Sequence, residues 1–430
     1  MTTALVISRF FPFNPERVHA VYQRLGTQVE ALARVTDRVD CLFLVPANKS
    51  YPPHELRKHE ERLRRLWSPS VSLRLAPTVR EDEPSTLWQR LGRGVFDFNA
   101  QPVARPTNTE AAVGAVGSAL DARPDLILAH RLSSMCVVMR LTHQLYGAPL
   151  FFDMDDIEHI SAFRRLLHHP GWPMERLMLL QIPRLMLAEI QAVRLATATF
   201  VSSEEDRRYL TRFSSSDRIC TVANSVRFTA VTAEDVSEPL VLFVGSMAYG
   251  PNAQAADALV QKIWPSIRAQ LPQARLVIIG SRPERATSYP SRDPSVTFAG
   301  FVDDLDEWYR RARVICCPIY YGAGTRVKII EAAAHGRAIV STPLGAEGLN
   351  FEDGRHIVLR HAAADLAAEC VRLLRDARAA EQLGAAARQR ARAIYDRATV
   401  VEQLVQIFRG HSSGTRSLRE VTTPGTRDAE

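Results

Sequence analysis

Short apolar runs alternate with amphipathic stretches through most of the chain. Runs typical of buried strands fall at residues 4–8, 39–45, 125–129, 149–152, 199–201 and 219–222, and again at 240–244, 274–279, 296–298, 314–317 and 338–341. Helical periodicity lies between or after them, at 17–35, 54–67, 109–120, 251–270, 325–335, 362–375, 379–393 and 399–408. This alternation of strands and helices predicts an α/β fold with doubly wound parallel sheets.

A polar, aperiodic segment divides the chain in two. Residues 227–239 read as a linker between Rossmann-like domains at 1–226 and 240–396. Residues 77–108 are rich in proline, glycine and polar residues, which predicts irregular structure. Residues 411–430 lack apolar periodicity, which predicts a disordered tail.

Two glycine loops flank a short helix within residues 322–348. Gly322 and Gly324 open the helix predicted at 325–335, Thr325 is placed to cap it, and Gly336 ends it. Arg326 and Lys328 fall in the first turn, where positive charge opposes the helix dipole. A bound phosphate would remove that conflict, because the free N–H groups of a helix start favour an anion.

Glu331 follows Lys328 on roughly the same helix face, where its carboxylate could accept hydrogen bonds from ribose hydroxyls. The spacing therefore predicts a nucleotide-diphosphate site. The alternative is a surface cluster of arginine, lysine and glutamate on an ordinary helix.

The same stretch resembles the donor-binding segment of family 4 glycosyltransferases, which are retaining enzymes with the GT-B fold. Many members carry two glutamates eight positions apart. Glu331 matches the second, but Ala323 stands at the first. The chain is more similar to a sub-group with a Gly-Gly-Thr-Arg-x-Lys-x-x-Glu loop. The resemblance implies two Rossmann-like domains facing across a cleft, with a helix at 397–410 that crosses back to the first domain.

The resemblance also implies roles for single residues. Arg326 and Lys328 would stabilise the leaving diphosphate, and Glu331 would hold the ribose. The donor pocket would include Gly245, Ser246, Gly324, Thr325, Gly345, Ala346 and Glu347, with Phe301 and Val302 beside the nucleobase.

His130 and Arg131 directly follow the strand predicted at 125–129. Ligands of open parallel sheets bind at the carboxyl ends of strands, which favours a functional position. The family resemblance implies that His130 donates or accepts a hydrogen bond at the transferred sugar. The alternative is a capping or core histidine.

Asp153 and Asp155 follow the next strand in an Asp-x-Asp pattern. Such a pair can hold a divalent metal, or it can cap a helix within an active-site loop. Because the nucleotide site falls in the other half, we favour the second interpretation and expect no metal. Asp153, Asp155 and Arg131 are then candidates for the acceptor side.

Composition limits the partners and the location. The net charge of +7 suits phosphate-bearing substrates or an anionic membrane, and no motif for reading nucleic acid appears. Six scattered cysteines favour a reducing cytoplasm.

The N-terminus reads as a strand rather than a signal peptide, and no apolar run approaches the roughly 20 residues that span a bilayer. Residues 54–67 and 161–195 are basic and partly apolar. They suit peripheral contact with the inner face of the cell membrane, or else a solvated helix face and core packing.

The main functional hypothesis is a retaining, metal-independent glycosyltransferase without a cofactor. It would move a hexose from a nucleotide diphosphate sugar to a hydroxyl of a glycan or lipid-linked acceptor. One alternative is a nucleotide-sugar epimerase or hydrolase on the same fold, using Asp153, Asp155 and Glu158. Another is a non-catalytic subunit that binds nucleotide sugars.

Overall fold

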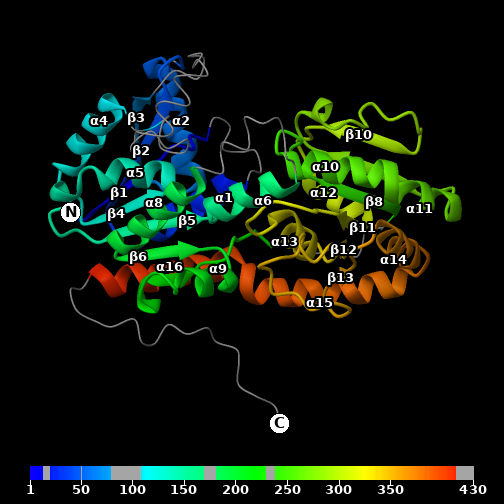
Figure 1. Cartoon of the computed structure of the whole chain (residues 1–430). Helices are drawn as coiled ribbons and strands as arrows, with labels where there is room; N and C mark the ends of the chain where they lie inside the picture. Colours follow the sequence, from blue (N-terminus) through cyan, green and yellow to red (C-terminus); the bar gives the residue numbers. More distant parts are fainter. Residues whose placement is uncertain are drawn as a thin grey trace, which may run out of the picture. The chain divides into compact units, whose positions relative to one another are not determined.

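The computed structural model describes residues 1–12, 20–49, 51–78, 107, 109–168, 181–228 and 238–412. The chain forms two compact units, which are described separately (Figure 1). Unit 1 contains Met1–His159, Leu177–Val222 and Val401–Glu430, and unit 2 contains Ile160–Arg176 and Ala223–Val400. The predicted tail beyond residue 412, most of the predicted linker and most of the predicted irregular segment lie outside the described residues.

Unit 1 is built on a seven-stranded sheet in the order β3-β2-β1-β4-β5-β6-β7, with every neighbouring pair parallel. The strands are β1 (Thr3–Ser8), β2 (Arg38–Pro46), β3 (Val71–Thr78), β4 (Leu126–His130), β5 (Leu150–Asp155), β6 (Ala198–Val201) and β7 (Ile219–Thr221). The strand order reverses between β1 and β4, where Ser8 pairs with His130 at the carboxyl ends. Such a switch point is the usual place for a ligand in an open α/β sheet.

The helices of unit 1 connect these parallel strands. They are α1 (Ala20–Leu32), α2 (Pro53–Leu66), α4 (Glu110–Leu120), α5 (Leu132–Met139), η1 (Thr142–Gln144), α8 (Ile182–Leu195), α9 (Glu204–Leu210) and η3 (Ser216–Arg218). Thr109 and Ser203 cap α4 and α9, because each side chain accepts a hydrogen bond from the first helical turn.

Two further helices are divided between the units. The helix α6 (Glu158–His168) begins in unit 1 and belongs to unit 2 from Ile160 onward. The last helix, α16 (Arg397–Ser412), belongs to unit 1 from Val401 onward. There Phe408 packs edge-on against Phe151 with ring centroids 4.8 Å apart, and Figure 1 shows α16 in red beside β6.

Unit 2 is built on a six-stranded parallel sheet in the order β10-β9-β8-β11-β12-β13. The strands are β8 (Glu238–Val244), β9 (Arg275–Ile279), β10 (Val296–Gly300), β11 (Ala312–Cys317), β12 (Ala338–Ser341) and β13 (Val358–Leu359). The order reverses between β8 and β11, so this sheet has a switch point of its own. The prediction of two Rossmann-like parallel sheets is confirmed.

The helices of unit 2 cover this sheet. They are α10 (Gly250–Ala258), η4 (Leu259–Ile263), α11 (Trp264–Gln270), η5 (Pro283–Arg285), α12 (Leu305–Arg311), α13 (Val327–Ala334), α14 (Ala363–Arg375) and α15 (Ala377–Tyr395). Both α14 and α15 pack against β11 and β12 (Figure 1). Within the described part of the chain, no helix is long and apolar enough to cross a membrane.

Several elements differ from the sequence-based expectation, among them a strand and a helix. The strand β3 was not predicted, although Val71, Leu73 and Ala76 are buried against β2. The single helix expected at 251–270 is interrupted by the π-helical turn η4. The interruption ends at Ile263, two residues before Pro265, which has no N–H group to donate to the preceding turn.

Candidate functional site

The chain comes close to itself at the carboxyl ends of β8 and β9, where Gly245 and Gly280 lie. A Cβ atom on Gly280 would lie 1.9 Å from the Gly245 carbonyl oxygen, and one on Gly245 would lie 2.6 Å from Nζ of Lys328. Any side chain at either position would therefore force the backbone or Lys328 to move. The neighbouring Ser246 and Ser281 hydroxyls lie 2.7 Å apart. At this end of the sheet, Gly245, Ser246, Gly280 and Ser281 form a closely packed surface next to Lys328, which we call the Gly245 seat.

Lys328, in the first turn of α13, reaches back to this seat. Its ammonium donates to Oδ1 of Asn252 at 2.6 Å and lies 4.5 Å from the centre of the Phe243 ring. Burial lowers the pKa of Lys328 to about 8, and the neighbouring Arg326 contributes in the same direction. The structure therefore brings together three predicted site residues, Gly245, Ser246 and Lys328.

Arg326 directly precedes α13 and is 6% exposed. Its Nη1 donates to the carbonyl of Ala323 at 2.6 Å and also to that of Gly324. Its Nε and Nη2 are buried and have no hydrogen-bond partner among the described residues. A buried guanidinium with two unused donors beside a helix N-terminus is suited to bind an anion.

The predicted cap of this helix is wrong. The helix begins at Val327 rather than at Thr325, and Arg326 occupies the N-cap position without a side-chain cap. Thr325 instead accepts a hydrogen bond of 2.7 Å from Nδ2 of Asn224. Among the described residues no side chain caps α13, so the N–H groups of Val327 and Lys328 remain available to a ligand, whereas that of Ile329 donates to the carbonyl of Arg326 at 2.9 Å.

Glu331 lies one turn further along α13. Its Oε2 accepts a hydrogen bond of 3.1 Å from the hydroxyl of Tyr309. Burial raises the pKa of Glu331, while the Tyr309 hydrogen bond opposes that rise. The carboxylate is therefore held by a neighbour on α12, in a position that the sequence spacing predicted for a ribose contact.

The second glycine loop follows β12. The N–H groups of Gly345 and Ala346 donate to Thr342, and that of Glu347 donates to Leu344. This turn therefore uses its own backbone donors. The Glu347 carboxylate instead accepts hydrogen bonds from Nη1 and Nη2 of Arg164 on α6, and Nη1 of Arg164 also donates to the carbonyl of Gly322 at 3.2 Å. In unit 2, Arg164 thus bridges the two glycine loops.

Phe301 and Val302 follow β10, two strands from β8 in the sheet. The carbonyl of Gly300 accepts a hydrogen bond of 2.7 Å from the N–H of Gly280, which ties this segment to the seat at Gly245. The side chain of Phe301 is 45% exposed at this edge of the sheet.

At the switch point of unit 1, His130 is completely buried. Its Nδ1 lies 2.9 Å from Oγ of Ser8, and its Nε2 lies 3.6 Å from Oδ2 of Asp153. Burial lowers the pKa of His130 to about 4, although Asp153 opposes that change. The imidazole is therefore neutral at physiological pH, and its tautomer depends on Ser8.

Asp153 and Asp155 both bind arginines. Arg24 contacts Oδ1 of Asp153 through Nε at 2.9 Å and Nη2 at 2.7 Å, and Arg131 binds Asp155 directly. Burial alone would raise the pKa of Asp155, but Arg131 and Arg24 lower it to about 2. Arg131 and Asp155 have φ values of 64° and 58°, which are uncommon for residues with a side chain. Strained residues that face each other at strand ends are typical of functional sites.

The interpretation of these aspartates as helix caps is wrong. The first N–H groups of α6 donate instead to the buried carboxylate of Glu189, at 2.7 Å from Glu158 and 3.4 Å from His159. Glu189 also binds Nδ1 of His159, and Nε2 of that ring lies 2.7 Å from the hydroxyl of Tyr209. Burial and the nearby Glu189 raise the pKa of Glu158 to about 7.

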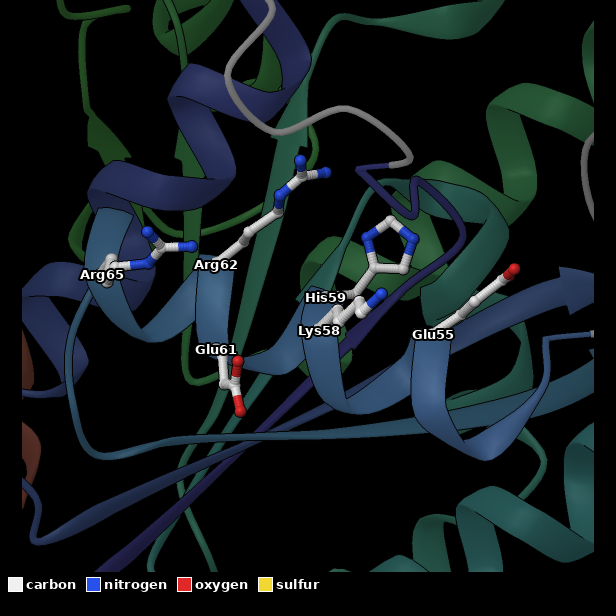
Figure 2. A pocket seen from close by; sticks show the side chains of 6 residues that line it. All are labelled: Glu55, Lys58, His59, Glu61, Arg62 and Arg65. Atoms are coloured by element: carbon white, nitrogen blue, oxygen red, sulfur yellow. The ribbon is translucent and has the colours of Figure 1, made fainter.

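A cavity of about 350 Å³ lies along α2 and includes none of the predicted site residues. Figure 2 shows the side chains that line it, all of them from this one helix: Glu55, Lys58, His59, Glu61, Arg62 and Arg65. Acids and bases of a single helix, away from the carboxyl ends of the strands, do not form the converging groups expected of a catalytic site.

Comparison with known proteins identifies a sequence similarity in unit 2. Residues 238–376 match the sequence profile of the family described as Glycosyl transferases group 1. The match lies within unit 2 and includes Gly245, Arg326, Lys328 and Glu331, whereas unit 1 lies outside it. No curated protein matches the chain.

Nearly the whole chain is similar in fold to several solved structures. Anabaena HepE in complex with UDP and glucose has a TM-score of 0.63 at 14% identity, covering 95% of this chain and 100% of that one. Sucrose-phosphate synthase from Thermosynechococcus elongatus has a TM-score of 0.66 at 20% identity, covering 96% and 100%. S. aureus TarM, in a complex that contains UDP, has a TM-score of 0.67 at 11% identity, covering 95% and 100%. The chain therefore has the GT-B fold.

Several residues of the two sites were not predicted. Asn252, Tyr309 and Arg164 hold Lys328, Glu331 and Glu347 in unit 2, and Arg24 and Glu189 organise unit 1. The position of Asn252 directly after Pro251, at a helix start that follows a strand, is the one local signal among them.

Proposed function

We propose that the protein is a retaining, metal-independent glycosyltransferase that uses a nucleotide diphosphate sugar. It transfers a hexose to a hydroxyl of a glycan or lipid-linked acceptor. The observation that carries the proposal is the Arg326 guanidinium, whose Nε and Nη2 are buried without a partner among the described residues. A diphosphate supplies the negative charge and the acceptor oxygens that these two donors lack.

The donor diphosphate binds between the start of α13 and the Gly245–Ser246 turn. During transfer, the bond from the anomeric carbon to the diphosphate oxygen breaks and a bond to the acceptor oxygen forms, while the acceptor proton leaves with the nucleoside diphosphate. Negative charge develops on the leaving diphosphate, where Arg326, Lys328 and the free N–H groups of α13 stabilise it. Glu331, held by Tyr309, accepts hydrogen bonds from the ribose.

UDP complexes of HepE and TarM support a nucleotide-sugar donor. The α-GlcNAc-glycerol in the TarM complex, a sugar joined to a glycerol oxygen, supports a hydroxyl as the acceptor group. A lipid-linked acceptor is supported by α6, where Phe163 and Leu167 lie one helical turn apart and are 47% and 63% exposed. The binding of Asp153 and Asp155 to arginines supports transfer without a metal at that pair, because arginines there occupy the carboxylate oxygens that a cation would need.

The test is donor binding and turnover by Lys328→Ala. A thermal-shift screen with UDP-glucose, GDP-mannose and ADP-glucose first identifies a donor, since a ligand that binds the native state raises its melting temperature. We expect Lys328→Ala to lower transfer by about 100-fold, because an ammonium beside the leaving diphosphate stabilises the charge that develops there. Lys262→Ala is the matched control, because Lys262 is an exposed lysine of the same unit, on η4.

Near-normal turnover by Lys328→Ala would refute the assignment. Incubation of the parent protein with the donor but without an acceptor separates the alternatives, because an epimerase or hydrolase would still convert the sugar. Tight donor binding without turnover against any acceptor pool would indicate a non-catalytic subunit instead.

A further inference from the structure

Asn252 connects the two segments that form the proposed diphosphate seat. It lies in the first turn of α10 and is 9% exposed. Its Oδ1 accepts a hydrogen bond of 2.6 Å from Nζ of Lys328, and its Nδ2 donates one of 2.9 Å to the carbonyl of Ser246. An ammonium can only donate and a carbonyl can only accept, so these two partners fix the orientation of the amide.

The ammonium of Lys328 has no acidic partner at ion-pair distance in the described part of the chain. The ionisable groups that act on it are Cys317 at the end of β11, Arg326 before α13, and Glu331, whose Oε2 already accepts from Tyr309. On its other side lies the Phe243 ring, 4.5 Å from Nζ. Asn252 is therefore the polar side chain that holds this ammonium in place.

A neutral amide suits this position better than a carboxylate does. A carboxylate would pair with the ammonium and cancel the charge that the donor diphosphate requires. The amide oxygen stabilises the protonated lysine through a hydrogen bond while leaving its charge in place. There is also little space between Gly245 and these two side chains. A Cβ atom on Gly245 would lie 2.6 Å from Nζ of Lys328 and 2.7 Å from Nδ2 of Asn252.

From these contacts we infer that Asn252 is a positioning residue for the donor diphosphate. It holds the Lys328 ammonium against the Gly245–Ser246 turn and keeps that ammonium protonated without neutralising it. This inference rests on the proposed function, because it assigns the diphosphate to the same seat.

The test is the pH dependence of donor affinity in variants of Asn252. Dissociation constants would be measured by calorimetry from about pH 6.5 to about pH 9.5, a range that brackets the lowered pKa of Lys328. The probe is whichever of UDP-glucose, GDP-mannose and ADP-glucose binds in the screen above. The diphosphate does not itself titrate in this range, but N3 of uracil and N1 of guanine lose a proton near its upper end. The midpoints are therefore compared between variants with the same donor, which share any contribution of the base.

In the parent protein, affinity should fall as the pH rises through about 8, where Lys328 loses its proton. Asn252→Ala removes the acceptor, so this fall should begin at lower pH and affinity at neutral pH should be about tenfold weaker. Asn252→Asp places a carboxylate beside the ammonium, so the fall should begin at higher pH. If Asn252 positions the lysine, the pH at which half of the affinity is lost should increase in the order Asn252→Ala, parent, Asn252→Asp.

Asn350→Ala is the control, because Asn350 is exposed and accepts from Arg390 away from the seat. Lys328→Ala shows whether the lysine itself carries the affinity.

If the parent binds and Lys328→Ala does not, but the pH midpoint of the affinity loss is the same in all Asn252 variants, Asn252 has only a structural role and the inference is wrong. If the parent binds none of the three donors, the proposed function fails first. If the aspartate variant does not fold, a midpoint in Asn252→Ala that equals the parent's still overturns the inference.

Discussion

The hydroxyl of Tyr309 donates a hydrogen bond of 3.1 Å to Oε2 of Glu331. The Tyr309 ring is buried and stacks on His335 with a centroid distance of 4.8 Å and an interplanar angle of 16°. Nδ1 of His335 in turn lies 2.8 Å from the backbone carbonyl of Glu331. The carboxylate proposed to bind the ribose is therefore fixed by a neighbouring helix before any donor arrives.

This arrangement predicts a selective effect of Tyr309→Phe. Without the hydroxyl, the Glu331 carboxylate can rotate, so its ribose hydrogen bonds become less favourable. We expect the donor KM to rise about five- to tenfold with little change in kcat, because the lost hydrogen bond reaches a charged group but not the reacting atoms. Steady-state kinetics at saturating acceptor would measure this effect.

Tyr395→Phe is the control for Tyr309→Phe. Tyr395 is also buried in unit 2, and its hydroxyl accepts from the N–H of Asn350 at 2.8 Å. It should lose stability without a change in donor KM. Equal KM values for both variants would show that the hydroxyl of Tyr309 serves packing alone.

The unused donors of Arg326 predict that lysine cannot replace it. Lysine keeps the positive charge but lacks the planar fork that reaches both Ala323 and a diphosphate at once. We expect Arg326→Lys to weaken donor binding by about 10- to 100-fold at low salt. Arg275→Lys, at the exposed amino end of β9, should bind the donor as the parent does. Parent-like binding by Arg326→Lys, measured calorimetrically, would mean that the buried nitrogens do not contact the ligand.

The strand pattern and the glycine-rich loop could be predicted from the sequence because both are local. Buried parallel strands appear as short apolar runs, and Arg326, Lys328 and Glu331 lie close together at the start of one helix. The helix start was misplaced because Thr325 is a good capping residue by type, yet its hydroxyl binds Asn224, 101 residues away. The strand β3 was missed because, among the described strands, it lies at the edge of the sheet beside β2 and carries the polar Arg74.

The residues that position the sites could not be predicted in the same way. Asn252 is 76 residues from Lys328, and Arg24 is 129 residues from Asp153. No pattern within one segment specifies such pairs, because the folded sheets bring them together. The Asp-x-Asp pattern was itself visible, but its chemistry depends on arginines supplied by α1 and by the residue after β4.

The buried His130 predicts a specific dependence of stability on pH. Its pKa is near 6.5 in an unfolded chain and about 4 here, so the native state binds fewer protons between those values. Its contribution to stability is therefore complete above about pH 6.5 and is lost as the pH falls toward 4, by about 3 kcal/mol in total. The buried Glu158, with a pKa near 7, changes stability in the opposite direction over an overlapping range. The informative quantity is thus the difference between parent and variant.

His130→Asn should remove this contribution. The melting temperature of His130→Asn minus that of the parent should rise as the pH is lowered from about 7 to about 5, since asparagine does not titrate there. His143→Asn, which replaces an exposed histidine of unit 1, should follow the parent at every pH. A constant difference between His130→Asn and the parent across this range would show that His130 is as easily protonated in the folded protein as in the unfolded chain.

Glu189 predicts a large loss of stability on truncation. Its completely buried carboxylate accepts from the N–H groups of Glu158 and His159 and binds the His159 ring. Glu189→Ala leaves these donors unpaired in the interior, which should cost about 3 kcal/mol and lower the melting temperature by about 10 °C. Glu189→Gln keeps one acceptor oxygen but turns an amide N–H₂ toward the other donors, so its loss should be intermediate. Glu205→Ala, on the exposed face of α9, should melt as the parent does. If Glu189→Ala also melted with the parent, the start of α6 would not depend on this carboxylate, and solvent would have to satisfy its N–H groups.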